Sequence, residues 1–284
     1  MNACPVNCNP QEFIAKAKAN DFAGAVETIT RNNPMGQTCG LICTNTFCMQ
    51  ACTRAGIDFP IKIPRVQATI LEKYRTAETA AHPKLPANGK KVAVIGAGPA
   101  GIAATAELSR LGYRITLFES FEKIGGALNL IPDKRLPFEV IAKDWSFIDD
   151  PDMIELRLNT PVNNPAALLE QDFDGVIVAT GEPEGINLGI DGEEHAVSYL
   201  DYLRHPEHYA ARGNIAVIGG GAVATDCALT AVNNGAENVE MFVRRRVSDM
   251  RVTGEERKSL LDAGVDLTTM TKIKKIGADG DYLT

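Results

Sequence analysis

The sequence predicts an α/β fold in which a cysteine-rich helical segment precedes two domains built on βαβ units. Three observations lead to this prediction. Six of the seven cysteines lie within the first 52 of 284 residues. Two glycine-rich turns, at residues 96–101 and 219–224, each follow a short apolar strand and open a helix. At roughly 150 residues per domain, the length also allows more than one domain.

The composition is that of an ordinary globular protein. Apolar residues make up 45% and charged residues 23% of the chain, and the net charge is −7 at pH 7. No window reaches the ~20 continuous apolar residues of a membrane helix, and a net acidic chain is not expected to bind nucleic acid. The N-terminus lacks the basic and apolar regions of a secretory signal. We therefore expect a cytoplasmic, reducing location in which the cysteines do not form disulfides.

Residues 1–80 are predicted to form an α-helical domain. Apolar side chains repeat with helical spacing around Phe13 and again at Val66 and Ile70. The cysteines between positions 39 and 52 fall in the irregular stretch between these helices. Residues 81–89, which contain two prolines and a glycine, are predicted to be a linker.

The next domain, residues 90–212, begins with a βαβ unit. Its first strand leads into Gly96, Gly98 and Gly101, which fit the GxGxxG pattern and precede a helix and a second strand. In this pattern the glycines let a pyrophosphate approach the backbone at the helix N-terminus. Glu119 ends the second strand, where a carboxylate can accept hydrogen bonds from a ribose. The turn is therefore expected to bind a dinucleotide, and residues 175–181 to form a later, buried strand.

The βαβ pattern recurs in a last domain, residues 213–284. Its turn, Gly219-x-Gly221-x-x-Ala224, is the GxGxxA variant. No acid ends the second strand, and three arginines, residues 244–246, follow it instead. Arginine at this position favours the 2′-phosphate of NADP, and Arg251 could add a contact.

Two dinucleotide-binding domains in one chain indicate two cofactors that exchange a hydride, a flavin in the first and NADPH in the second. The cofactors carry that chemistry, so no catalytic acid or base is expected of the protein. A flavin can release its electrons singly, and the cysteine-rich segment could hold their acceptor. The C-x3-C-x4-C-x3-C spacing without histidine favours an iron–sulfur cluster over zinc or free thiols. Cys227 lies inside a predicted helix and is expected to be a small core residue.

Taken together, the motifs resemble the family of the bacterial glutamate synthase small subunit and the N-terminal half of dihydropyrimidine dehydrogenase. The likeness runs in order along nearly the whole chain. It rests on the segment 33–43, Cys48-x3-Cys52, Ile61-x-Ile63 before Gln67, the turn 94–101, Gly125-Gly126, Arg135-Leu-Pro137, Ala179-Thr-Gly181 and Asp226-Cys-Ala228.

The resemblance implies residues for each cofactor. FAD would be held by Gly96, Gly98, Pro99, Ala100, Gly101, Glu119, Gly126, Arg135 and the backbone near Val162. NADPH would be held by Gly220, Gly221, Ala222, Val223, Arg244, Arg245 and Arg251. One [4Fe-4S] cluster would take Cys4, Cys43 and Cys48, with Gln67, Cys52 or Cys8 as the fourth ligand. Cys39 matches a position that is not a ligand in the family.

The family's NADPH domain continues beyond the point that matches Thr284, so we expect the second dinucleotide-binding domain to be incomplete. The predicted function is that of an NADPH-oxidising flavoprotein that passes single electrons through a [4Fe-4S] cluster to an electron-accepting subunit or domain. One alternative is a non-catalytic iron–sulfur relay or scaffold subunit that needs a second chain to complete its flavin site. A second alternative is a flavin disulfide reductase. That activity needs a redox-active dithiol, usually Cys-x-x-Cys, beside the flavin, and the sequence has no such pair after residue 52. The terminal acceptor stays open.

Overall fold

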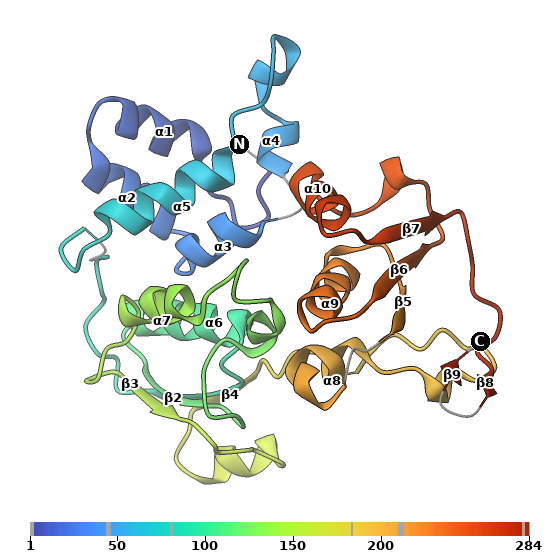
Figure 1. Cartoon of the computed structure of the whole chain (residues 1–284). Helices are drawn as coiled ribbons and strands as arrows, with labels where there is room; N and C mark the ends of the chain where they lie inside the picture. The colour runs from blue at the N-terminus through green and yellow to red at the C-terminus, as the bar shows by residue number, and fades with distance from the viewer. Residues whose placement is uncertain are drawn as a thin grey trace. The chain divides into compact units, whose positions relative to one another are not determined.

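The computed structural model of the chain describes residues 3–43, 47–79, 82–182, 184–209, 213–279 and 282–283. It divides into two compact units (Figure 1). The first comprises Met1–Asn129 and Asp133–Gly181, and the second comprises Leu130–Pro132 and Glu182–Thr284. In the described part of the chain, no helix is both long and apolar enough to cross a membrane.

The first unit begins with a small helical bundle. Its helices are α1 (Pro10–Lys18), α2 (Phe22–Thr30), α3 (Gly36–Ile42), α4 (Phe47–Gln50), the 3₁₀ helix η1 (Thr53–Gly56) and α5 (Ile63–Tyr74). Asn9 and Asp21 cap α1 and α2 by accepting backbone N–H groups at Glu12 and Gly24. Phe13, Ile29 and Leu71 are fully buried between α1, α2 and α5. The helical prediction is confirmed as far as Tyr74, and Ala80 lies outside the described residues.

The same unit continues with a parallel sheet in the order β3-β2-β1-β4. Figure 1 shows α6 and α7 on one side of this sheet. Its elements are β1 (Lys91–Ile95), α6 (Pro99–Arg110), β2 (Arg114–Phe118), η2 (Gly126–Leu130), α7 (Phe138–Ser146), β3 (Ile154–Arg157), η3 (Pro165–Glu170) and β4 (Gly175–Val178).

The strand expected at 175–181 is present as β4, at Gly175–Val178, but its expected burial is wrong. Strand β4 is the edge of the described sheet, because it pairs with β1 on one side only. Its side chains are half-buried, and Val178 is 59% exposed. An unbroken apolar run is typical of a central strand, but the run does not specify where in the strand order it falls.

The second unit repeats the parallel arrangement with three strands, in the order β5-β6-β7. Met241, Val243 and Leu260 are buried in its core. Cys227 is 8% exposed, which confirms its prediction as a core residue, and burial raises the pKa of its thiol to about 12. Its elements are η4 (Glu193–His195), α8 (Tyr199–Arg204), η5 (Pro206–His208), β5 (Asn214–Ile218), α9 (Ala222–Asn233), β6 (Asn238–Val243), η6 (Val247–Asp249), α10 (Gly254–Asp262), β7 (Asp266–Thr269), β8 (Ala278–Asp279) and β9 (Tyr282–Leu283).

Candidate functional site

The first glycine turn joins β1 to α6 in a backbone path that side chains would block. Gly96 has φ +102°, and a Cβ on it would lie 2.4 Å from the carbonyl oxygen of Ala179. A Cβ on Gly101 would lie 1.8 Å from the Gly96 carbonyl oxygen, whereas one on Gly98 would have 3.8 Å to its nearest neighbour. Gly96 and Gly101 are therefore required by the fold, whereas the fold does not require glycine at position 98, where the sequence predicts the approach of a ligand.

Glu119 lies directly after β2 and is turned back onto this turn. Its Oε2 accepts a hydrogen bond from the Ala97 N–H at 2.8 Å, and its Oε1 accepts one from the Phe121 N–H at 3.0 Å. The residue is 5% exposed. The Ser120 hydroxyl also donates to Oε1 at 3.2 Å. An ionised carboxylate has about four lone-pair sites, so these three bonds leave capacity for one ribose hydroxyl. The buried carboxylate fixes the turn and is also within the predicted FAD site.

The other predicted FAD residues differ in how closely the structure ties them to the turn. The Gly125 N–H donates to the Ala97 carbonyl at 2.8 Å, and a Cβ on Gly126 would lie 2.9 Å from the Gly98 Cα. The glycine pair 125–126 therefore packs on the first turn. Val162 packs on the apolar cluster that contains Phe118, next to the end of β2. Arg135 is half-buried, and its neighbour Leu136 is buried.

The second glycine turn joins β5 to α9. Gly219 has φ +149°, and a Cβ on Gly220 would lie 2.4 Å from a methyl carbon of Val243. The Arg251 N–H donates to the Gly220 carbonyl at 3.2 Å, so the loop that carries this arginine lies against the turn. Arg244 and Arg245 come directly after β6, the neighbour of β5 in the sheet, and Arg244 is exposed. The structure thus brings both ends of the predicted NADPH site to one edge of the sheet.

The cysteines of the helical bundle differ in their surroundings. We call Cys4, Cys39, Cys43 and Cys48 the cysteine group, and Cys52 is not part of it. Burial raises the pKa of Cys48, and the nearby thiols of Cys43 and Cys4 raise it further. Burial also raises the pKa of Cys39, and the thiols of Cys43 and Cys4 contribute in the same direction. Cys52 differs, because hydrogen bonds from backbone N–H groups, first that of Ile61, lower its pKa. The expectation that the cysteines of 39–52 fall in an irregular stretch is wrong for two of them, because Cys39 lies in α3 and Cys48 in α4. Soft thiolates gathered on and around these two short helices fit the donor set of an iron–sulfur cluster.

The candidates for a fourth ligand occupy different surroundings. Gln67 on α5 is buried, and its Nε2 donates to the Gly36 carbonyl at 2.7 Å. Gly40 brings α3 close to α5, because a Cβ there would lie 2.7 Å from the Pro64 carbonyl oxygen. Cys8 is 4% exposed, and its thiol donates to the Ile29 carbonyl at 3.7 Å in the core of the bundle. Burial raises its pKa to about 12, which disfavours the thiolate that a metal needs.

A buried ion pair that the sequence analysis missed connects the bundle to the first dinucleotide-binding fold. Arg75 follows α5 and Asp144 lies on α7, and their side chains are 2.6 Å apart and 3% and 1% exposed. The other Asp144 oxygen accepts the Thr38 N–H at 2.9 Å, and Arg75 also donates to the Pro34 carbonyl. The only sequence signal was that Asp144 follows Ile141 by one helical turn on the apolar face of its helix. We call Arg75, Asp144 and the Thr38 N–H the junction.

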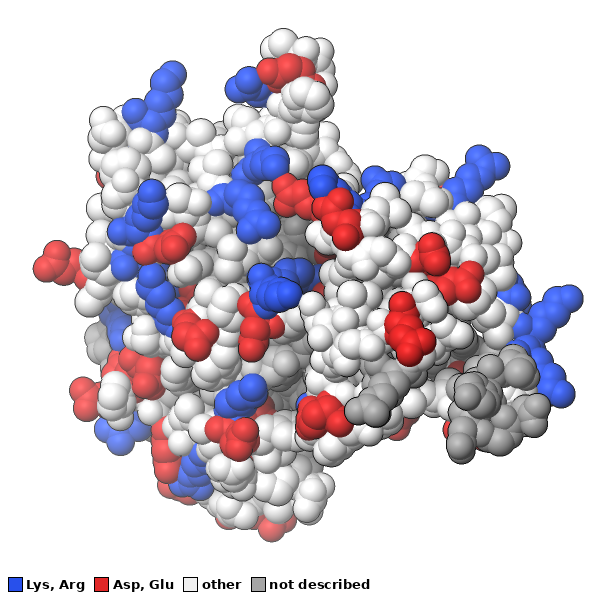
Figure 2. Space-filling view, in the orientation of Figure 1, with Lys and Arg blue, Asp and Glu red and all other residues white. Residues whose placement is uncertain are grey.

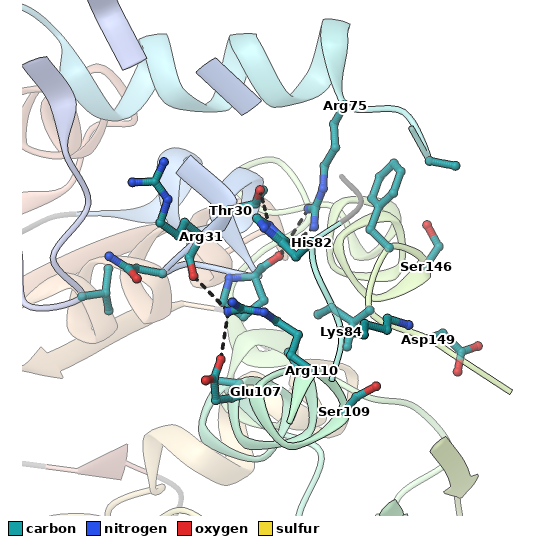
Figure 3. A pocket seen from close by; sticks show the side chains of 18 of the residues that line it. Thr30, Arg31, Arg75, His82, Lys84, Glu107, Ser109, Arg110, Ser146 and Asp149 are labelled. Carbon is teal, nitrogen blue, oxygen red and sulfur yellow. Dashed lines mark hydrogen bonds and ion pairs between the residues drawn. The ribbon is translucent and has the colours of Figure 1, made fainter. Parts of the chain in front are cut away.

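A cavity of about 840 Å³ lies beside the junction, between α6, α7 and the bundle (Figure 3). His82 lines it and shares a 2.8 Å hydrogen bond with the Thr30 hydroxyl, and burial lowers the pKa of this imidazole. Each Lys or Arg side chain that lines the cavity in the described structure already has an acidic partner: Glu27 for Arg31, Asp144 for Arg75, Asp150 for Lys84 and Glu107 for Arg110. We therefore assign it no anionic ligand. On the face in Figure 2, acidic and basic side chains are likewise interspersed.

Comparison with known families divides the chain in the predicted order. The [4Fe-4S] domain II of dihydropyrimidine dehydrogenase matches residues 1–79. An NAD(P)-binding Rossmann-like domain matches residues 94–146, and the pyridine nucleotide-disulphide oxidoreductase family matches residues 149–284. The α/β fold with an iron–sulfur domain in front is thereby confirmed.

Curated relatives match over nearly the whole chain. The NAD-dependent dihydropyrimidine dehydrogenase subunit PreT of Escherichia coli K12 is 33% identical over 276 residues, which cover 93% of this chain and 66% of PreT. The NADP(+)-dependent formate dehydrogenase subunit beta of Moorella thermoacetica is 28% identical, and the match covers 93% of this chain and 42% of that one. This chain thus spans 66% or less of the length of either relative.

Among solved structures, a 2-naphthoyl-CoA reductase complex is similar with a TM-score of 0.60 and 21% identity. The match covers 77% of this chain and 33% of the reductase. At this identity the likeness concerns the fold alone.

Both curated relatives are named as subunits, and their names differ in the nicotinamide cofactor.

Proposed function

We propose that the chain oxidises NADPH and delivers single electrons to a partner subunit or domain, because it carries regions similar to the [4Fe-4S] domain II of dihydropyrimidine dehydrogenase and to pyridine nucleotide-disulphide oxidoreductases. FAD in the first dinucleotide-binding fold would supply the change from two-electron to one-electron chemistry. The observation that carries the proposal is the junction. It ties the thiol-bearing helix α3 to α7, and the Glu119 turn belongs to the same compact unit.

The preference for NADPH over NADH is the part of the proposal that the second unit supports. Arg244 and Arg245 follow β6 without an intervening acid, and Arg251 is held by its backbone against the turn. Arginine can form charge-assisted hydrogen bonds with a 2′-phosphate, whereas a carboxylate at this position would repel it. PreT, by its name, depends on NAD, so the arginines are the feature that must decide the cofactor here.

For the cluster, we propose the ligands Cys4, Cys43, Cys48 and Gln67. The thiols of Cys43 and Cys4 both lie close enough to Cys48 to raise its pKa, and α3 packs closely on the helix that carries Gln67; both observations support this set. Cys52 stays a second candidate for the fourth position, and the burial of Cys8 in the bundle core argues against it.

The role of the junction in this function is to fix α3. Asp144 accepts a hydrogen bond from the first turn of α3, and Arg75 holds the Pro34 carbonyl just before that helix. Removing one partner of a buried ion pair leaves the other charge uncompensated, at a cost of about 3–5 kcal/mol, whereas replacing both with apolar residues is often neutral.

A variant series tests this role. We expect Asp144→Asn to slow cluster reduction more than flavin reduction in rapid-mixing spectra with NADPH. We expect the double variant Arg75→Met, Asp144→Leu to recover stability without recovering the rate. Lys84→Ala is the matched control, because the Lys84–Asp150 pair is half exposed on the lysine side and such pairs contribute at most ~1 kcal/mol. Equal slowing of both steps in Asp144→Asn would reduce the junction to a structural contact.

The experiment that tests the function is an absorption spectrum of anaerobically purified protein with iron and flavin quantified. We expect flavin bands over a broad iron–sulfur shoulder, about four irons per chain, and bleaching of both by NADPH. Iron without flavin would support the relay or scaffold subunit instead. Absence of iron, or NADPH-driven disulfide reduction, would contradict the proposal.

A further inference from the structure

Two imidazoles and a carboxylate meet on the short turn that follows α8. Glu207 Oε1 lies 3.5 Å from His205 Nδ1 and 3.7 Å from His208 Nε2. The three donor atoms all lie within 4.8 Å of one another. We propose that these three side chains form a surface site for a divalent transition metal ion, with zinc as the reference ion.

The donor separations are close to what such a site needs. Bonds of 2.0–2.1 Å in a tetrahedral zinc site place the ligand atoms about 3.3 Å apart. The two separations from Glu207 exceed this by only a few tenths of an ångström. The rings of His205 and His208 are stacked, with centroids 4.9 Å apart and planes 15° apart. They must splay to aim both lone pairs at one ion, and this motion is open to them because both side chains are about half exposed or more.

The backbone that carries the three donors is held in place. The His205 N–H donates to the Asp201 carbonyl at 3.0 Å, and the His208 N–H donates to the His205 carbonyl at 3.0 Å. Pro206 restricts φ between the first two ligands. The ring of Tyr209 lies 5.9 Å from that of Tyr202, which packs on the core of the second unit. An ion would therefore have to order three side chains but no backbone.

The chemistry of the donors selects the class of ion. Two imidazole nitrogens and one carboxylate oxygen form the His₂Glu set that holds zinc with a fourth position open to water. Mg²⁺ and Ca²⁺ prefer all-oxygen sites, so they are poor competitors here. The soft, partly buried thiols of the cysteine group could also bind zinc. The test must therefore distinguish zinc bound at the cysteines from zinc bound at His205, Glu207 and His208.

The test is calorimetric titration of the cluster-loaded protein with zinc chloride, because loading occupies Cys4, Cys43 and Cys48, the cysteines proposed as cluster ligands. We expect one equivalent of zinc to bind, and binding to weaken at least about tenfold in His205→Ala and in His208→Ala. His195→Ala is the matched control, since His195 lies 3.9 Å from a carboxylate oxygen of Glu194 but has no second imidazole beside it in the described structure. It should bind zinc as the parent does.

Cobalt substitution gives a readout that is independent of affinity. Co²⁺ in the proposed site should show weak ligand-field bands without a thiolate charge-transfer band, and His208→Ala should abolish them. Zinc binding that persists in both histidine variants, falls equally in His195→Ala, or shows thiolate charge transfer with cobalt would overturn the proposal.

Discussion

The two glycine turns share a strand–turn–helix arrangement but differ in the side chain that they accommodate at the third position of the pattern. In the first turn the third glycine is obligatory, because a Cβ on Gly101 would lie 1.8 Å from the Gly96 carbonyl oxygen. The second turn carries Ala224 at the equivalent place and accommodates its methyl group. The first strand pair ends in the buried carboxylate of Glu119, and the second ends in Arg244 and Arg245. Helix–strand spacing and the proposed cofactor preference thus depend on separate positions, so we expect that each can be changed alone.

The largest effect is expected from Gly101→Ala. The new methyl group has no room beside the Gly96 carbonyl, so the helix must move away from the strand, at a cost of about 3 kcal/mol. Urea unfolding and flavin content measure the loss. Gly98→Ala is the control for stability, because its Cβ would have 3.8 Å to the nearest atom. It should keep the free energy of unfolding and lose only flavin. A Gly101→Ala protein with parental stability would refute the close packing.

Next in size is the double variant Arg244→Ala, Arg245→Ala. Loss of charge-assisted hydrogen bonds to a 2′-phosphate should cost about 2 kcal/mol, which lowers the ratio of kcat/KM for NADPH over NADH by roughly 30-fold. Steady-state kinetics with both cofactors measure this ratio. Arg246→Ala, a substitution in the same run but outside the proposed site, should leave it unchanged. A ratio unaffected by the double variant would mean that the chain does not read the 2′-phosphate here.

A smaller effect is expected from Glu119→Gln. The amide keeps one acceptor for the Ala97 or Phe121 N–H but loses the charge, so stability should fall by about 1 kcal/mol and FAD affinity by roughly fivefold. Thermal unfolding and flavin titration report the two quantities. Glu155→Gln on the exposed end of the same sheet is the matched substitution and should leave FAD affinity as it is. Unchanged FAD affinity in Glu119→Gln would leave Glu119 with a purely structural role.

The smallest effect is expected from Ala224→Gly, which gives the second turn the sequence pattern of the first. Glycine in the first turns of a helix costs about 0.5–1 kcal/mol in conformational entropy, and the turn geometry needs no other change. Differential scanning calorimetry and NADPH titration check this. A loss of NADPH binding would show that the Ala224 methyl group does more than fill space.

The parts of the structure that the sequence predicted well are local. Each glycine turn, its strand and its helix lie within about thirty residues, and backbone sterics dictate them. The exposure of β4 could not be predicted, because it depends on strand order, which joins β1 to a strand some eighty residues later. The Arg75–Asp144 pair is also out of reach of pattern analysis, since it connects positions 69 residues apart and neither residue belongs to a motif. The sequence alone also could not choose the fourth cluster ligand, because the packing of α3 on α5 that supports Gln67 is a contact between separate helices.

The junction also bears on how such proteins can be recombined. Arg75 belongs to the helical segment and Asp144 to the following fold, and either charge left alone in that buried place is strongly unfavourable. A chimera that joins this helical segment to the flavin fold of a relative should therefore work only when the acceptor supplies a carboxylate at the matching place. The pair thus sets a compatibility requirement between the two segments, and we expect a change at one position to be tolerated only with a matching change at the other.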